Sequence, residues 1–339
     1  MKRLLSLLLI AGALSTAPLA QSTGAKLVVL NKEDATLVTM DPASGKILGT
    51  VPTGEGPHEV AVSDDGKTAF VGNYGGAQGP GTTISVIDLA AMKEVRRFDT
   101  RPLLRPHGVF FRNGRVYFTS ETYRIVGRYD PAANQVDWLL GTGQAGTHMV
   151  WVNRDATRMY TCNIGSDSMT IIERGANANA WNETVVPVGK GPEGFDVSPD
   201  GRELWAAHSR DGGVSIVDLE QKKVVATIDL QTRRSNRLKF TPDGKLALVS
   251  DLDAGELLVL DVPTRKVTKK ILNFRMRKGS TNQVLDVTPG EHVIRIEVDS
   301  SGYDASRRIR GVFKSGETRR LEATVDGLIK KDLTLVWGS

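Results

Sequence analysis

Cysteine is almost absent from this chain of 339 residues, because Cys162 is the only one. A single thiol excludes a disulfide framework, a thiolate zinc site and haem attachment through paired cysteines. Aromatic residues are few, at 6%, and after the N-terminal segment no apolar run approaches the roughly 20 residues that a membrane-spanning helix needs. With 40% hydrophobic and 24% charged residues, the chain is expected to be globular. Cys162 lies in an apolar run, and we expect it to be buried.

The first 22 residues have the layout of a secretory signal peptide. Lys2 and Arg3 precede the apolar run 4–14, and small residues follow as far as Ala20 and Ser22. We therefore predict export to the periplasm or the medium, with cleavage between residues 20 and 22. The mature chain is expected to have no membrane span.

Charge gives little support for a nucleic-acid partner. The formal charge of +5 falls to +3 without Lys2 and Arg3, and residues 272–339, with 12 basic and 9 acidic residues, account for that remainder. Nucleic-acid binding usually needs a concentrated basic face, so we expect no such partner. A short basic cluster elsewhere is interpreted as solvated loop residues or an anion-attracting patch. Its members are Arg233, Arg234, Arg237 and Lys239.

A repeat of about 45 residues organises the chain. An alternating apolar segment that ends in an acidic residue occurs six times, and the acids are 47, 42, 43, 45 and 43 residues apart. These acids are Asp41, Asp88, Asp130, Glu173, Asp218 and Asp261.

Tight turns between two apolar strands recur in phase with these segments. Asp-Gly and Asn-Gly pairs tolerate the positive φ angles of tight hairpins, so four of the five turns indicate hairpins. The fifth contains Asp155-Ala156, and we expect it to be looser. The turns are 64–67, 112–115, 154–157, 199–202 and 242–245.

Each repeat therefore predicts four short antiparallel strands. A sheet of that size cannot bury both apolar faces by itself, so neighbouring sheets must stack. Repeated four-stranded units are typical of an all-β fold, the β-propeller, with blades around a central channel. An open solenoid is the alternative. The sequence supplies five full blades and an N-terminal set of three strands that lacks its innermost strand.

The segments 56–73 and 191–201 resemble the bacterial YVTN-type propeller repeat, which is grouped with lactonase-like and cytochrome d1-like propellers. The resemblance covers about residues 25–271. It implies a propeller of six to seven blades over residues 23–271. It does not imply one function, because the superfamily includes binding proteins, lactonases, lyases and scaffolds.

After Lys270 the repeat stops, and residues 272–339 resemble a small PEGA-type β-module. Strands are expected near 283–288, 291–298, 308–313 and 319–325. The alternative is a divergent last blade, in which residues 333–337 supply the missing innermost strand of the first sheet.

The phase of the repeat maps polar residues onto one face of the disc. An innermost strand starts where the second strand ends, because the two are antiparallel neighbours. Both sets of positions should therefore surround one mouth of the channel. The inner-strand starts are His58, His107, His148, Glu193 and Asn236. The second-strand ends are Asn31, Asn73, Ser120, Asn163, His208 and Asp251, with Glu121 and Arg210 just beyond two of them.

Three interpretations of these positions stay open. The residues can hydrogen-bond the connecting loops and line a water-filled channel. They can form a binding funnel for a small polar or anionic ligand, with the histidines as donors. Alternatively, His58, His107 and His148 can bind a divalent metal, with Glu193 as a further ligand, and activate water.

We predict an exported, non-catalytic propeller that binds a small polar ligand or another envelope protein and is a monomer. The alternative is a metal-assisted periplasmic hydrolase of lactone-like substrates. A divalent metal is the only cofactor that the residues suggest. The glycine-rich segment 72–81 has no helix after it, so we expect a long flexible loop there and no phosphate site.

Overall fold

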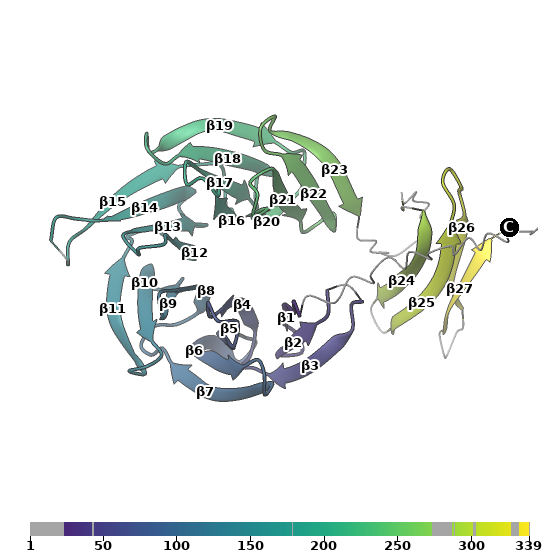
Figure 1. Ribbon diagram of the computed structural model, residues 1–339, viewed down its shortest axis with the longest axis horizontal. Helices are drawn as coiled ribbons and strands as arrows, with labels where there is room; N and C mark the ends of the chain where they lie inside the picture. Colours follow the sequence, from purple (N-terminus) through teal and green to yellow (C-terminus); the bar gives the residue numbers. More distant parts are fainter. Residues whose placement is uncertain are drawn as a thin grey trace, which may run out of the picture.

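A computed structural model of the chain is shown in Figure 1. The structure describes residues 24–42, 44–177, 179–272, 287, 289–300, 303–326 and 332–338. Every element within these ranges is a β-strand, and none of the described residues form a helix that could cross a membrane. The predicted signal peptide lies outside the described residues.

Five four-stranded antiparallel sheets make up most of the ring, and in each of them the strands lie side by side in chain order. The first two sheets comprise β4 (Pro57–Val62), β5 (Thr68–Gly76), β6 (Gly79–Asp88) and β7 (Lys93–Asp99), then β8 (Pro106–Arg112), β9 (Arg115–Ser120), β10 (Ile125–Asp130) and β11 (Gln135–Gly141). The third comprises β12 (Thr147–Val152), β13 (Arg158–Asn163), β14 (Ser168–Arg174) and β15 (Trp181–Pro187). The last two comprise β16 (Pro192–Val197), β17 (Glu203–His208), β18 (Gly213–Asp218) and β19 (Lys223–Asp229), then β20 (Ser235–Phe240), β21 (Leu246–Asp251), β22 (Glu256–Asp261) and β23 (Lys266–Leu272).

A sixth sheet precedes these five and has three strands, β1 (Leu27–Asn31), β2 (Thr36–Met40) and β3 (Ile47–Pro52). Figure 1 shows the six sheets arranged around one axis, with β4, β8, β12, β16 and β20 innermost. The fold is therefore a six-bladed β-propeller, as the repeat predicts, and the solenoid alternative is wrong. The first blade has no innermost strand among the described residues.

Apolar side chains from neighbouring blades form the core between the sheets. Trp205 and Ile216 of one blade are completely buried against Leu258 and Leu260 of the next. Similar clusters lie between other neighbouring blades. The stacking that hides these faces holds the inner strands at fixed positions around the axis.

Four of the five hairpin turns share one geometry, including the turn that was expected to be looser. The turn 112–115 differs, because both Asn113 and Gly114 have positive φ between the paired residues Arg112 and Arg115. Gly66, Gly201 and Gly244 have φ near +70° and donate a backbone hydrogen bond to the residue three positions earlier. Ala156 makes the same hydrogen bond and has a φ of 54°. The expectation of a looser turn was wrong, because Asn153 accepts hydrogen bonds from the backbone beyond Ala156 and supports the left-handed conformation.

The glycine-rich segment 72–81 is an extended hairpin and not the flexible loop that we expected. It continues β5 and β6, with Gly75 opposite Pro80 and Gly76 opposite Gly79. The backbone N–H of Tyr74 donates to the carbonyl of Gly56 in the preceding connection. These contacts fix Tyr74 close to the start of β4.

The C-terminal strands form two additional small sheets. They are β24 (Gly290–Ser300) paired with β25 (Tyr303–Phe313), and β26 (Arg320–Asp326) paired with β27 (Asp332–Gly338). In Figure 1 all four strands lie beside the ring. Because β27 pairs with β26, residues 333–337 do not complete the first sheet. The strand expected at 283–288 lies almost entirely outside the described residues, and the likeness to a PEGA module stays a prediction.

The blades approach one another most closely at the inner strands. A Cβ atom added to Gly194 would lie 2.5 Å from the carbonyl oxygen of Asn236 and 2.7 Å from the Cα of Arg237 in the next blade. A Cβ atom on Gly108 would lie 2.7 Å from the carbonyl oxygen of His148. Only glycine permits this spacing, because all three neighbouring atoms belong to the backbone.

We expect Gly194→Ala to lower the free energy of unfolding by roughly 1–3 kcal/mol, because the methyl group forces two inner strands apart. Gly141→Ala is the control, since its Cβ would meet no atom within 4 Å, and it should change stability by less than about 0.5 kcal/mol. Urea denaturation of both variants measures the difference. Equal stabilities would show that the inner strands are not tightly spaced.

Candidate functional site

Every innermost strand has a β-bulge near its start. In β4, Pro57 pairs with Asn73 and Glu59 pairs with Gly72, so His58 is an extra residue. The same irregularity leaves His148 extra in β12 and Glu193 extra in β16. A bulge re-aims a side chain and increases the local twist. In β8 and β20 the register shifts at the corresponding places, between 106 and 109 and between 235 and 238.

The bulged residues of three consecutive blades bring their imidazole rings into contact. The ring centroids of His58 and His107 are 4.3 Å apart, and those of His107 and His148 are 3.7 Å apart. We call the side chains of the five inner-strand starts the hub. Its members are His58, His107, His148, Glu193 and Asn236.

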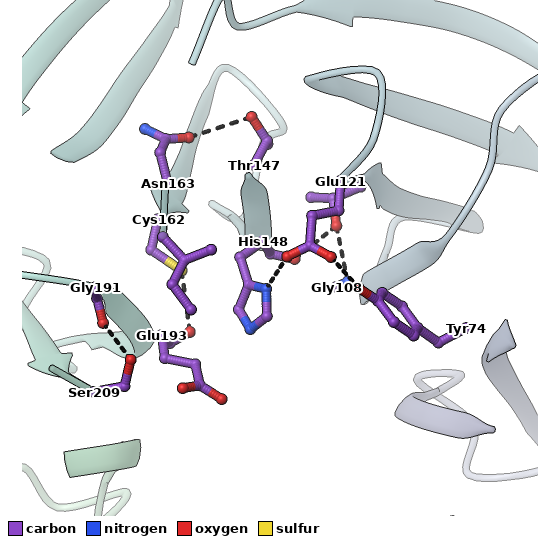
Figure 2. Close-up of polar contacts among 12 residues, drawn as sticks. Tyr74, Gly108, Glu121, Thr147, His148, Cys162, Asn163, Gly191, Glu193 and Ser209 are labelled. Carbon is purple, nitrogen blue, oxygen red and sulfur yellow. Dashed lines mark hydrogen bonds and ion pairs between the residues drawn. The ribbon is translucent and has the colours of Figure 1, made fainter. Parts of the chain in front are cut away.

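Glu121 joins the hub from just beyond the end of β9. Figure 2 shows its carboxylate between Tyr74 and His148. The Tyr74 hydroxyl donates to one oxygen, and Nδ1 of His148 is 2.9 Å from the other. The Tyr74 ring also stacks on His58, with centroids 5.3 Å apart. Tyr74, which the sequence did not indicate, therefore connects the first histidine of the hub to the third.

An arginine bridge crosses between non-adjacent blades at the hub. One guanidinium nitrogen of Arg237, in β20, is 2.7 Å from Glu59 in β4. Its other terminal nitrogen is 3.2 Å from Glu193 in β16. The expectation that this basic cluster consists of solvated loop residues is wrong for Arg237, because its neighbours in the fold are two carboxylates of other blades.

Glu193 and Asn236 also bond directly. The side-chain amide of Asn236 donates to Oε1 of Glu193, the same oxygen that Arg237 approaches. The backbone carbonyl of Glu193 accepts the thiol hydrogen of Cys162, with sulfur and oxygen 3.1 Å apart (Figure 2). Cys162 is completely buried, and burial raises the pKa of its thiol to about 12. It serves as a small packing residue there.

Three buried side-chain atoms in the described part of the chain have no hydrogen-bond partner, and all three belong to the hub. They are Nδ1 of His107, Nε2 of His148 and Oε2 of Glu193. The residues are 1%, 5% and 7% exposed. Buried polar groups in proteins are nearly always hydrogen-bonded, so three exceptions in consecutive blades mark this as the candidate functional site.

The second-strand ends have a different role, because they hold loops and turns. Asn73 uses its amide for hydrogen bonds to Gly54, Thr83 and Ser85. The remaining members are bonded in a similar way. Asn163 bonds Thr147, Thr161, Ser168 and Thr170; His208 bonds Asp211 and Ser215; Asp251 accepts four backbone N–H groups; Ser120 bonds Leu104; Asn31 bonds Thr36; and Arg210 pairs with Asp167.

The structure does not support the metal hypothesis for the histidines. Within the described residues, no group of three or more histidine, cysteine, aspartate or glutamate side chains is arranged to hold a metal ion. Instead the rings pack against one another, and Nδ1 of His148 is engaged by Glu121. Metal ligation requires imidazole nitrogens that point to a common centre.

Burial lowers the pKa values of two hub histidines, His58 and His107. Burial and the nearby charges of Lys32 and Arg237 lower the pKa of His58 to about 3. Burial, assisted by the neighbouring histidines, holds the pKa of His107 well below its usual range. For Glu121, burial raises the pKa, but the hydrogen bonds from His148 and Tyr74 outweigh it, so that the pKa lies below its usual range. Glu121 is therefore a carboxylate at neutral pH.

Comparison with known proteins supports the fold and leaves the function open. The family model for the cytochrome D1 haem domain matches residues 150–291, which is less than half of the chain. A hydrazine synthase of Kuenenia stuttgartiensis aligns over 70% of this chain and 74% of its own, with 17% identity and a TM-score of 0.61. No curated protein matches the sequence.

Two further solved structures show the same propeller. A functionally unknown protein from Desulfotomaculum acetoxidans is 15% identical over 74% of this chain and 82% of its own, with a TM-score of 0.62. A proposed 6-phosphogluconolactonase from Bacteroides uniformis is 19% identical over 72% of this chain and 81% of its own, with a TM-score of 0.58. At these identities the likeness shows the fold alone.

The residues at the hub do not fit a haem, although the matching family model carries that name. Axial ligation needs an imidazole that faces a slot wide enough for the macrocycle. Here His107 and His148 are buried against each other, and Arg237 crosses between blades beside them. We therefore assign no haem to this site.

We expect the stability of the protein to fall as the pH decreases from about 6.5. The unfolded chain binds a proton to His107 near its ordinary pKa of about 6.5, whereas the folded protein does not, so protons favour unfolding below that pH. One such histidine contributes about 2 kcal/mol of this loss by pH 5. Urea denaturation from pH 7.5 to 5 should show a smaller pH dependence in His107→Leu than in the native protein. Identical slopes would mean that His107 is already protonated in the folded state.

Proposed function

We propose that this protein is a binding protein whose propeller hub holds a small polar ligand. The observation that carries the proposal is the set of three unpartnered polar atoms on His107, His148 and Glu193. An unsatisfied buried donor or acceptor costs about 1–3 kcal/mol, so a chain that retains three of them in consecutive blades is less stable than one in which they are bonded. A ligand that bonds these atoms recovers that free energy on binding.

The contrast between two equally buried histidines supports this assignment. His107 and His208 are both 1% exposed. Both ring nitrogens of His208 are bonded, one to Asp211 and the other to the backbone N–H of Ser215. The His208 side chain therefore has no hydrogen-bonding group left for a ligand. His107 has an unpartnered Nδ1. Within the described residues, no hydrogen bond accounts for the polar Nδ1 atom at position 107.

Export and a role in the cell envelope are part of the proposal. The N-terminal sequence, with its basic start and short apolar run, supports them. The small formal charge of the chain favours a small ligand over a nucleic acid. A monomer suffices for this function, because one chain contributes every hub residue. Binding of another envelope protein stays an alternative for the C-terminal strands.

We expect His107→Leu to raise the thermal midpoint of the ligand-free protein at pH 7.5 by a few degrees, because it removes a polar atom without a partner. His208→Leu is the matched control. It should lower stability by about 1–3 kcal/mol, because the side chain of Asp211 and the backbone N–H of Ser215 lose their partner. Calorimetry of both variants makes the comparison. A similar loss in the two variants would show that His107 is structural and would contradict the proposed site.

Hydrolysis of a lactone-like substrate is a second candidate, and the pair Glu121–His148 favours it. The carboxylate holds the proton on Nδ1 of His148 and leaves Nε2 as a potential general base for water. The name of the Bacteroides uniformis neighbour suggests the substrate class to try. Assays with glucono-δ-lactone and 6-phosphogluconolactone should show hydrolysis that His148→Gln reduces at least 100-fold. Activity equal in the two proteins would exclude His148 as the base.

A further inference from the structure

We propose that the hub recognises a primary ammonium group, so that its ligand is a small amine. This inference rests on the proposed function and specifies the ligand class. Three buried atoms at the hub have no hydrogen-bond partner. Oε2 of Glu193 and Nε2 of His148 can each accept a hydrogen bond, and Nδ1 of His107 can do so in one of its two tautomers. A primary ammonium has three N–H donors and one positive charge.

His148 presents an acceptor because its other nitrogen is committed. Nδ1 lies 2.9 Å from a carboxylate oxygen of Glu121, and that carboxylate also accepts the Tyr74 hydroxyl hydrogen. A carboxylate accepts and cannot donate, so in the singly protonated form of the ring the proton is on Nδ1. Nε2, which has no partner, therefore carries a lone pair. Figure 2 shows this nitrogen on the side of the ring that faces away from Glu121.

Glu193 presents a second acceptor, and this one carries charge. Its Oε1 already accepts hydrogen bonds from Asn236 and Arg237. Its Oε2 has no hydrogen bond, and a guanidinium nitrogen of Arg234 is 3.9 Å away. A charge-assisted hydrogen bond to a cationic donor is about twice as strong as a neutral one. An N–H donor with a positive charge suits Oε2 best.

His107 supplies the third position. Its ring lies 3.7 Å from that of His148, and its Nδ1 has no partner. A neutral imidazole has one donor and one acceptor nitrogen, and the ring adopts the tautomer that its neighbours favour. Beside a cationic donor the favoured tautomer has the lone pair on Nδ1. This proposal differs from the interpretation in which the histidines donate hydrogen bonds to a small polar or anionic ligand.

The site also limits the size of the group that it recognises. The three atoms have no water-accessible surface in the free protein, and the Arg237 bridge to Glu59 crosses between blades close by. A compact head group satisfies this constraint better than a bulky one. An anion such as a carboxylate would place its oxygens against Oε2 of Glu193 and the lone pair of His148, and both contacts are repulsive.

A series of one-carbon probes tests the assignment on the full chain. Methylammonium is a cation with three N–H donors, methanol is neutral with one donor, and formate is an anion without a donor at pH 7.5. Each is titrated at constant ionic strength while the imidazole Cε1–H signals are followed by NMR. We expect methylammonium to shift the His107 and His148 signals in a saturable manner, with a much weaker effect of methanol and no effect of formate. The His208 signal should not move with any probe.

Two glutamate variants provide the matched comparison. Glu193→Gln removes the charged acceptor and should weaken methylammonium binding about tenfold, which corresponds to about 1.4 kcal/mol. Glu203→Gln changes a carboxylate of the same blade that pairs with Arg265 and Trp205, and it should leave binding unchanged. An unchanged His208 signal in each variant reports that the fold is intact.

The possible outcomes separate this inference from the proposed function. If formate shifts the hub histidines and methylammonium does not, the hub binds a ligand but the ligand class is wrong. Binding of methylammonium that is equal in the native protein and in Glu193→Gln also overturns the assignment. If no probe shifts the hub signals while His107→Leu stabilises the protein, ammonium is excluded and the hub remains a binding site. If no probe acts and His107→Leu destabilises like His208→Leu, both proposals fail.

Discussion

The structure depends on one constraint: each four-stranded sheet of this chain is apolar on both faces and cannot be stable alone. Trp205 and Ile216 are completely buried only because the next blade covers them. Stacking of successive sheets around an axis satisfies the constraint, and it brings the five inner strands together. Residues that are about 45 positions apart in the sequence therefore become neighbours at the hub.

Polar side chains at the hub and at the second-strand ends differ in how completely they are hydrogen-bonded. At the strand ends, Asn73, Asn163 and His208 have their hydrogen-bonding groups engaged by nearby loops and turns. At the hub, the bulges turn His148 and Glu193 out of the ladder, and each retains an unpartnered atom. The first arrangement stabilises the fold. The unpartnered atoms at the hub lower the stability of the fold, and they are the groups that a ligand can bond.

Much of the fold and part of the site could be predicted from the sequence. The repeat phase identified the inner-strand starts, because chain position and angular position in a propeller are proportional. It also placed Asn73 and His208 close to the right strand ends. The repeat phase could not separate the inner-strand starts from the second-strand ends by role. Whether all hydrogen-bonding groups of a side chain have partners depends on local neighbours such as Thr83 and Ser215. The phase of a repeat carries no such information.

The roles that the sequence did not reveal depend on local geometry that a sequence pattern does not encode. Glu59 and Arg237 each follow a hub residue directly, and in a regular strand they would point to the opposite face. The bulges break that alternation, and a bulge has no clear sequence signal. Tyr74 lies in a glycine-rich segment that is typical of loops, whereas long-range pairing with the connection before β4 makes it a hairpin. Ala156 likewise adopts a conformation that glycine occupies in the related turns.

The bridge from Arg237 to Glu59 has a mechanical consequence for the ring. In the described part of the chain, no strand of the last blade pairs with a strand of the first. Within that part of the chain, the two ends of the ring are therefore held to each other without a shared sheet. The Arg237–Glu59 ion pair joins the last blade to the second one beside the axis. Side chains near the centre thus contribute to the closure that backbone pairing provides within each blade.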